Sequence, residues 1–96
     1  MTENPKKGPS VTLKISEEIQ RGAYANKVIV AHSRDEFVFD FVADFPPGPQ
    51  IVARVITAPA HAAALLEALG ENLARYERQH GPIHRPHPDR GQPADA

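Results

Sequence analysis

The sequence predicts an α+β fold: a four-stranded antiparallel β-sheet followed by one C-terminal amphipathic helix packed on one face of the sheet. Two patterns predict it. Between residues 11 and 57 apolar and polar side chains alternate in several segments, which is the period of a strand buried on one face. After Pro59 the apolar residues recur at steps of three and four, the period of an amphipathic helix. A chain of 96 residues allows one domain.

The four predicted strands are residues 11–16, 23–33, 36–45 and 50–57. The third is the clearest, because its phenylalanines fall on one face, and Val38, Asp40, Val42 and Asp44 fall on the other. Residues 17–22 break the alternation and predict a turn or a single helical turn. The short polar link after Ser33 predicts a hairpin between the second and third strands. Residues 46–49, Pro-Pro-Gly-Pro, offer one backbone donor in four residues and predict a turn.

The helix is predicted to begin at Pro59, which suits the first helical position, and to end at Gly81-Pro82. Its apolar stripe consists of Ala62, Leu65, Leu66, Leu69, Leu73 and Tyr76. Gly70 interrupts the helix at a cost of about 1 kcal/mol relative to alanine, which suggests close packing at that position.

Both ends of the chain are predicted to be disordered, residues 1–10 and the proline-rich tail 82–96. They hold few large apolar side chains, so burial cannot offset an ordering cost of roughly 1–2 kcal/mol per residue. The folded domain is therefore residues 11–81. A domain of this size is marginally stable as a monomer.

Composition narrows the functional classes. The chain has no cysteine and a net charge of −1, so we expect no thiol chemistry, and nucleic acid is not the favoured partner. The N-terminus lacks the apolar segment of a signal peptide, and no apolar run is long enough for a membrane span. We expect a cytoplasmic protein with no membrane partner.

The sheet is expected to present a second apolar face. One helix covers one face, whereas Val38 and Val42 point to the other, accompanied by either Ile29 and Ala31 or Val28 and Val30. This predicts a homo-oligomer in which a second subunit covers that face. Asp40 is expected to pair with Arg54 on the neighbouring strand. The interface or binding candidates are Val38, Asp40, Val42, Arg54, Tyr24 and Asn26.

The residues that come closest to catalytic chemistry are His32, Glu36, His61 and Asn72. His32 and Glu36 flank the predicted hairpin, and such a pair can perform acid–base chemistry; a hairpin-end hydrogen bond is the simpler interpretation. His61 in the first helical turn is assigned a structural role. We predict no catalytic residue and no cofactor. We also predict no metal site, because the histidines of the tail lack fixed geometry.

Three stretches resemble a known family. They are Tyr24-Ala25-Asn26 leading into residues 28–33, residues 36–41, and residues 54–56 continuing through Pro59, His61, Leu65, Leu66, Leu69, Asn72 and Tyr76-Glu77. Together they are similar to the small prokaryotic "domain of unknown function 3467" family over about residues 13–81. The resemblance implies a compact protein and no established activity. Ala58, Ala60 and Ala63 stand where the family tends to carry threonine, glutamate and lysine.

Three functional hypotheses remain. The first is a non-enzymatic oligomeric binding or scaffold module that recognises a protein partner through a free sheet face or an edge strand. The second is a nucleic-acid-associated protein that uses Lys14, Arg21, Lys27 and Arg54. The third is a small enzyme that uses His32, Glu36 and His61. Convergence of the four basic residues on one face would favour the second hypothesis. Convergence of His32, Glu36 and His61 in one cleft would favour the third.

Overall fold

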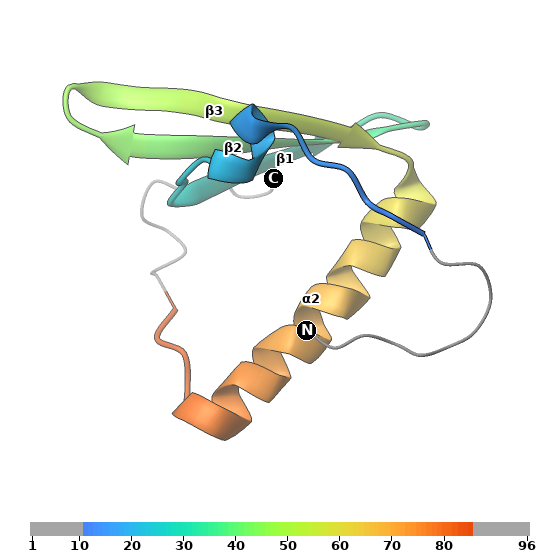
Figure 1. Ribbon diagram of the computed structural model, residues 1–96, viewed down its shortest axis with the longest axis vertical. Coiled ribbons are helices and arrows are strands. Elements are labelled where there is room, and N and C mark those ends of the chain that lie inside the picture. Colours follow the sequence, from blue (N-terminus) through green and yellow to red (C-terminus); the bar gives the residue numbers. More distant parts are fainter. Residues whose placement is uncertain (1–10, 86–96) are drawn as a thin grey trace.

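The computed structural model describes residues 11–85. Its element order is α1 (Glu17–Arg21), β1 (Lys27–His32), β2 (Phe37–Phe45), β3 (Gly48–Thr57) and α2 (Pro59–His80). The three strands form one antiparallel sheet in the order β1-β2-β3, and α2 leaves the end of β3 and runs away from it (Figure 1). The α+β class, the antiparallel sheet and the C-terminal helix are confirmed. The predicted disordered ends lie mostly outside the described residues.

The sheet has three strands, not the predicted four. Residues 11–16 alternate as a strand does, but they form no ladder, and Val11, Leu13 and Ile15 are 78%, 89% and 59% exposed. The segment instead leads into α1, where the Ser16 hydroxyl accepts a hydrogen bond from the Ile19 N–H at 3.2 Å. Alternation shows that a segment is amphipathic, but a strand also needs a neighbour with free backbone groups. Residues 17–22 form the predicted helical turn, which ends at Gly22 with φ 75°.

Both hairpins have short links. Ser33 donates its N–H to the Glu36 carbonyl at 2.9 Å between β1 and β2, which confirms that hairpin. Pro46 and Pro47, joined by a cis peptide bond, connect β2 to β3. A β-bulge lies opposite Phe41 and Val42: Phe41 pairs with Ala53 and Val42 pairs with Ile51, so Val52 is the extra residue. Because strand side chains alternate between faces, this extra residue moves Ile51 to the Val42 side of the sheet.

Helix α2 begins and ends where the sequence predicted. Pro59 occupies the first turn, and the backbone of Gly81 takes φ 91° and donates its N–H to the Glu77 carbonyl. Ala58 makes no side-chain cap, in keeping with its replacement of a threonine that the family tends to carry.

The predicted packing of the helix on the sheet is wrong for the single chain. Leu65, Leu69 and Tyr76 are 47%, 51% and 51% exposed, and Leu66 is 71% exposed. Among the described residues only Val42, 6% exposed, is a buried hydrophobic residue. The helical period predicts which side of α2 is apolar, but it does not say which molecule covers that side.

Gly70 has open space around it rather than the close packing that its position suggested. A Cβ built at Gly70 meets no atom within 4 Å. We therefore expect Gly70→Ala to stabilise the protein by about 0.5–1 kcal/mol, because alanine has less conformational freedom to lose. Thermal unfolding at one fixed protein concentration measures the change. The exposed Ala64→Gly on the same helix is the matched reverse change and should destabilise by a similar amount. A loss of stability in Gly70→Ala would show that another surface packs against Gly70.

Candidate functional site

Strand pairing sorts the sheet into two chemically different faces. Residues directly opposite each other across antiparallel strands share a face. The phenylalanine face consists of Val28, Val30, His32, Phe37, Phe39, Phe41, Ala43, Phe45, Gln50, Ala53, Val55 and Thr57. The ion-pair face consists of Lys27, Ile29, Ala31, Val38, Asp40, Val42, Asp44, Ile51, Arg54 and Ile56. Of the two alternatives open from the sequence, the register therefore places Ile29 and Ala31 beside Val38 and Val42.

Two ion pairs cross the ion-pair face. The Arg54 guanidinium donates to both carboxylate oxygens of Asp40, from Nε to Oδ1 at 2.7 Å and from Nη2 to Oδ2 at 2.9 Å. The Lys27 ammonium donates to Asp44 Oδ2 at 2.7 Å. The predicted pairing of Asp40 with Arg54 is confirmed. A bidentate pair such as Asp40–Arg54 fixes the relative position of the two strands. The phenylalanine face, in contrast, carries no Lys, Arg, Asp or Glu on its described strand residues.

The Asp40–Arg54 pair makes the stability of the fold depend on pH. The hydrogen bond from Arg54, with its positive charge, holds the pKa of Asp40 below its usual value, against a partial burial that raises it. A lowered folded pKa contributes stability above the unfolded value of about 4, and this contribution is lost as the pH falls through the folded pKa.

We therefore expect Asp40→Asn to lower the melting temperature at pH 7 and to lower it much less at pH 3. The Asp35→Asn variant is the control, because Asp35 is an exposed loop carboxylate that has no ion pair within the described contacts. Thermal melts at both pH values, at one protein concentration, measure the difference. An equal loss at pH 3 and pH 7 would mean that the charge of Asp40 does not contribute.

The interface candidates on and near the sheet make contacts within their own chain. Asn26 extends the β1–β2 ladder, because its side-chain oxygen accepts the Asp44 N–H at 2.9 Å. The ring of Tyr24 stacks on Phe45 at a centroid distance of 6.0 Å, although Tyr24 remains 75% exposed. Val42 is already buried, and Val38 is half-buried. These contacts give Asn26 and Val42 a structural role in the single chain, and leave Tyr24 available at the surface.

Of the candidate catalytic residues, His32, Glu36 and His61 lie near the end of the sheet from which α2 begins, whereas Asn72 lies in the middle of α2. His32, Phe37 and Thr57 are neighbours across the three strands, and the ring of His32 stacks on Phe37 at 5.1 Å. His61 lies in the first turn of α2, and Glu36 precedes β2. The Asn72 side chain donates to the Ala68 carbonyl within its own helix at 3.0 Å. No three His, Asp or Glu side chains in residues 11–85 gather as a metal site.

The basic residues of the nucleic-acid hypothesis are partly neutralised. Lys27 and Arg54 share the ion-pair face, but each is paired with a carboxylate. Arg21 lies in α1, and Lys14 precedes that helix outside the sheet. Phosphate recognition requires positive charge that is free to displace counterions, so pairing weakens this hypothesis.

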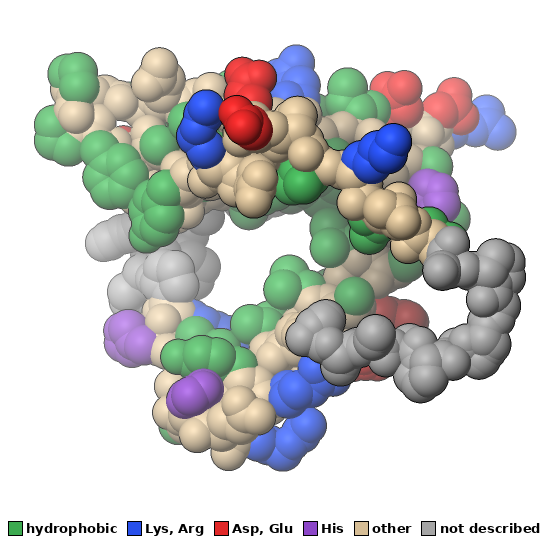
Figure 2. Space-filling view, viewed as in Figure 1, with side chains coloured by type: hydrophobic (Ala, Val, Ile, Leu, Met, Phe, Trp, Pro, Cys, Tyr) green, Lys and Arg blue, Asp and Glu red, His purple; other side chains and the backbone are tan. Residues whose placement is uncertain are grey.

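The structure exposes a large apolar surface. The sequence predicted which residues are apolar, but it did not predict that they are exposed. A hollow separates the sheet from α2, and hydrophobic side chains line it from both sides, whereas charged side chains gather on the outside (Figure 2). The exposed apolar residues of α2 form the leucine stripe, which we define as Leu65, Leu66, Leu69, Leu73 and Tyr76. Both faces of the sheet also expose apolar side chains: Val28, Phe45 and Val55 on the phenylalanine face are 43%, 47% and 50% exposed, and Ile29, Ile51 and Ile56 on the ion-pair face are 44%, 52% and 54% exposed. Contiguous apolar surface of this kind marks an interaction site.

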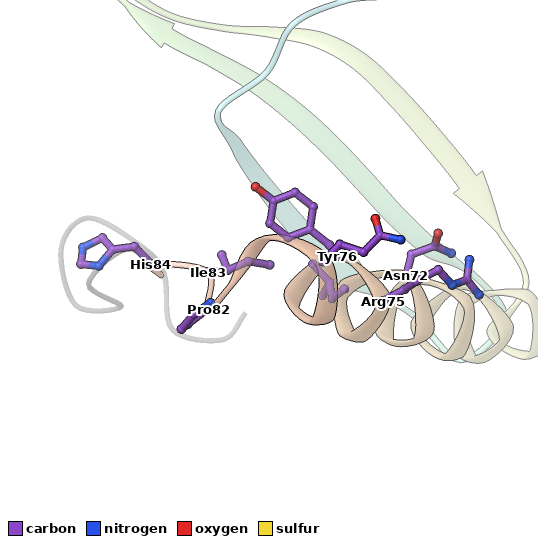
Figure 3. Close-up of a pocket in the computed structure, with 8 residues that line it drawn as sticks. Asn72, Arg75, Tyr76, Pro82, Ile83 and His84 are labelled. Carbon is purple, nitrogen blue, oxygen red and sulfur yellow. The ribbon is translucent and has the colours of Figure 1, made fainter.

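An open pocket of about 680 Å³ lies where the chain turns back after α2 (Figure 3). Its lining residues are Asn72, Leu73, Arg75, Tyr76, Gln79, Pro82, Ile83 and His84. Glu77 holds this segment, since its Oε2 accepts the Ile83 N–H at 2.9 Å and lies 3.6 Å from Arg85 Nη1. The pocket includes the last two residues of the leucine stripe, so it continues the apolar surface rather than forming a separate enclosed site.

Neither described helix combines the length and the apolar composition needed to cross a membrane.

The comparison with family models finds a match to "Protein of unknown function (DUF3467)" over residues 1–85. No curated protein and no solved structure matches the chain. The match covers most of the sequence, so the chain belongs to the DUF3467 family.

Proposed function

We propose that this member of the DUF3467 family is a non-enzymatic binding module that works as a homo-oligomer. One observation carries the proposal: the leucine stripe of α2 is exposed in the described part of the chain. Fully burying a leucine, valine or phenylalanine contributes about 1.5–3 kcal/mol, and among the described residues only Val42 is a buried hydrophobic residue. A single chain therefore lacks the buried apolar surface that offsets the entropy of folding.

The apolar surface favours self-association over catalysis. Catalytic sites bring polar groups together in a concave, partly enclosed pocket. Here the imidazole of His32 stacks on a phenylalanine, and the Asn72 amide is held by its own helix. Oligomerisation would cover the stripe and the phenylalanine face while leaving the ion-pair face and the edge strands β1 and β3 for a protein partner. Strand addition at an edge is a common mode of such recognition.

The test is the mass of the full chain in solution. Sedimentation equilibrium between about 1 and 100 µM should give at least twice the mass of one chain, within the concentration range of specific protein association. The variant Glu71→Gln, which changes the polar side of α2, should behave identically. A wild-type chain that remains a folded monomer at hundreds of micromolar would falsify the proposal.

A further inference from the structure

The junction between β3 and α2 consists of one residue. Strand β3 ends at Thr57, α2 begins at Pro59, and Ala58 alone connects them. Thr57 is fixed by its pairing with Phe37. The Ala58 carbonyl is fixed as well, because it accepts the N–H groups of His61 and Ala62, each at 3.0 Å. Few backbone dihedral angles between the sheet and the helix therefore remain free to change.

The remaining backbone freedom is small for steric reasons. The pyrrolidine ring holds the φ of Pro59 close to −65°. A residue before proline is confined to extended conformations, and Ala58 has φ −80° and ψ 158°. Folding α2 back onto its own sheet would require Ala58 or Thr57 to leave these conformations. The short junction and its proline therefore restrict how far α2 can turn toward its own sheet.

A second copy of this chain fits the exposed surfaces in number and in chemistry. Within the described residues, each chain has an exposed leucine stripe and a phenylalanine face on which Val28, Phe45 and Val55 are exposed and Phe37, Phe39 and Phe41 are half-buried. A reciprocal exchange would cover both surfaces in both chains. A two-fold arrangement in which stripe meets face and face meets stripe is self-complementary. The phenylalanine face suits the stripe better than the ion-pair face does, because Lys27, Asp40, Asp44 and Arg54 all lie on the latter. Leucines laid over them would remove water from two ion pairs.

We propose that the protein is a helix-exchanged dimer in which the leucine stripe of each chain packs on the phenylalanine face of its partner. This inference rests on the proposed function, since it requires self-association, and it specifies the surfaces that meet. It predicts that the stripe of one chain and β3 of the other are adjacent, whereas the stripe and β3 of the same chain are not.

The absence of cysteine permits a clean cross-linking test. Two full-length single-cysteine chains are prepared, Leu66→Cys on the stripe and Val55→Cys on the phenylalanine face, with a mass tag on one of them. They are mixed, refolded together and treated with a short bis-maleimide linker. The effective concentration of neighbouring sites in a complex is in the millimolar range, so at about 10 µM chain the cross-linked heterodimer should exceed random coupling by roughly a hundredfold.

Two replacements serve as matched controls. Glu71→Cys lies on the opposite side of α2 from the stripe, and Ile56→Cys lies on the ion-pair face next to Val55. Glu71→Cys mixed with Val55→Cys, and Leu66→Cys mixed with Ile56→Cys, should both couple at the random level. Leu69→Cys provides a second stripe position if Leu66→Cys fails to fold, as judged by circular dichroism.

The possible results distinguish a failure of the helix exchange from a failure of self-association itself. Coupling that is equal for stripe and control positions in a chain that still dimerises would overturn the helix exchange and leave the oligomeric module intact. A chain carrying both Leu66→Cys and Val55→Cys that cross-links within itself at low concentration would overturn it too, because the helix would then close on its own sheet. A monomer at every concentration would overturn both proposals.

Discussion

Leu69→Asp should abolish the dimer that we propose and, with it, cooperative folding. Leu69 is 51% exposed in the single chain, so in a monomer the substitution would change stability by no more than about 0.5 kcal/mol plus a small loss of helix propensity. In a helix-exchanged dimer the same substitution places a carboxylate against the phenylalanine face of the partner. Burying an unpaired charge there costs several kcal/mol, which a small domain cannot offset.

Sedimentation and urea unfolding of the Leu69→Asp chain measure this effect. The control is Ala64→Asp, which introduces the same charge in the same helix on the side away from the stripe. This variant should associate and fold as the wild type does, apart from a small loss of stability because aspartate has a lower helix propensity than alanine. If the two variants behave alike, the leucine stripe is not at an interface.

Dilution should lower the melting temperature. When folding and association are one equilibrium, a hundredfold dilution reduces the apparent stability by about 2.7 kcal/mol per dimer, the value of two factors of ten, which is about 1.4 kcal/mol per chain. For a domain of this size each kcal/mol corresponds to about 4–8 °C. The melting temperature should therefore fall by roughly 5–10 °C between 100 µM and 1 µM chain, by combination of these two relations.

Circular dichroism in cells of different path length measures the two melts under the same buffer and heating rate. Gly70→Ala is the useful companion, because it should raise both melting temperatures and leave the difference between them unchanged. A melting temperature that does not depend on concentration would show that a single chain is the folding unit.

Local chemistry made much of the fold predictable. The proline and glycine at the two ends of α2 predicted its limits correctly, and the phenylalanine alternation predicted the faces of β2. The Asp40–Arg54 pair could also be predicted, because hairpin geometry brings opposite charges on neighbouring strands together. These features depend on residues close in sequence or directly opposite in the ladder.

The features that the sequence did not predict depend on more distant partners. The alternation in residues 11–16 resembles that of a strand, but within residues 11–85 neither edge of the sheet pairs with it. The bulge at Val52 shifts one strand by one residue, and nothing in the side chains of β3 marks it. The uncovered stripe was also missed, because an amphipathic pattern is the same whether its cover comes from the same chain or from another.

The single residue between β3 and α2 has a consequence for how this protein can vary. Most connections between secondary-structure elements accept insertions, because lengthening a surface loop costs little entropy. At Ala58 an insertion would act differently. A few flexible residues there would free the helix to swing onto its own sheet, and each chain would then satisfy its own apolar surface. In the helix-exchanged dimer that we propose, the shortness of this connection and the proline that follows it would keep each chain from closing on itself. We therefore expect residues inserted after Ala58 to favour a folded monomer.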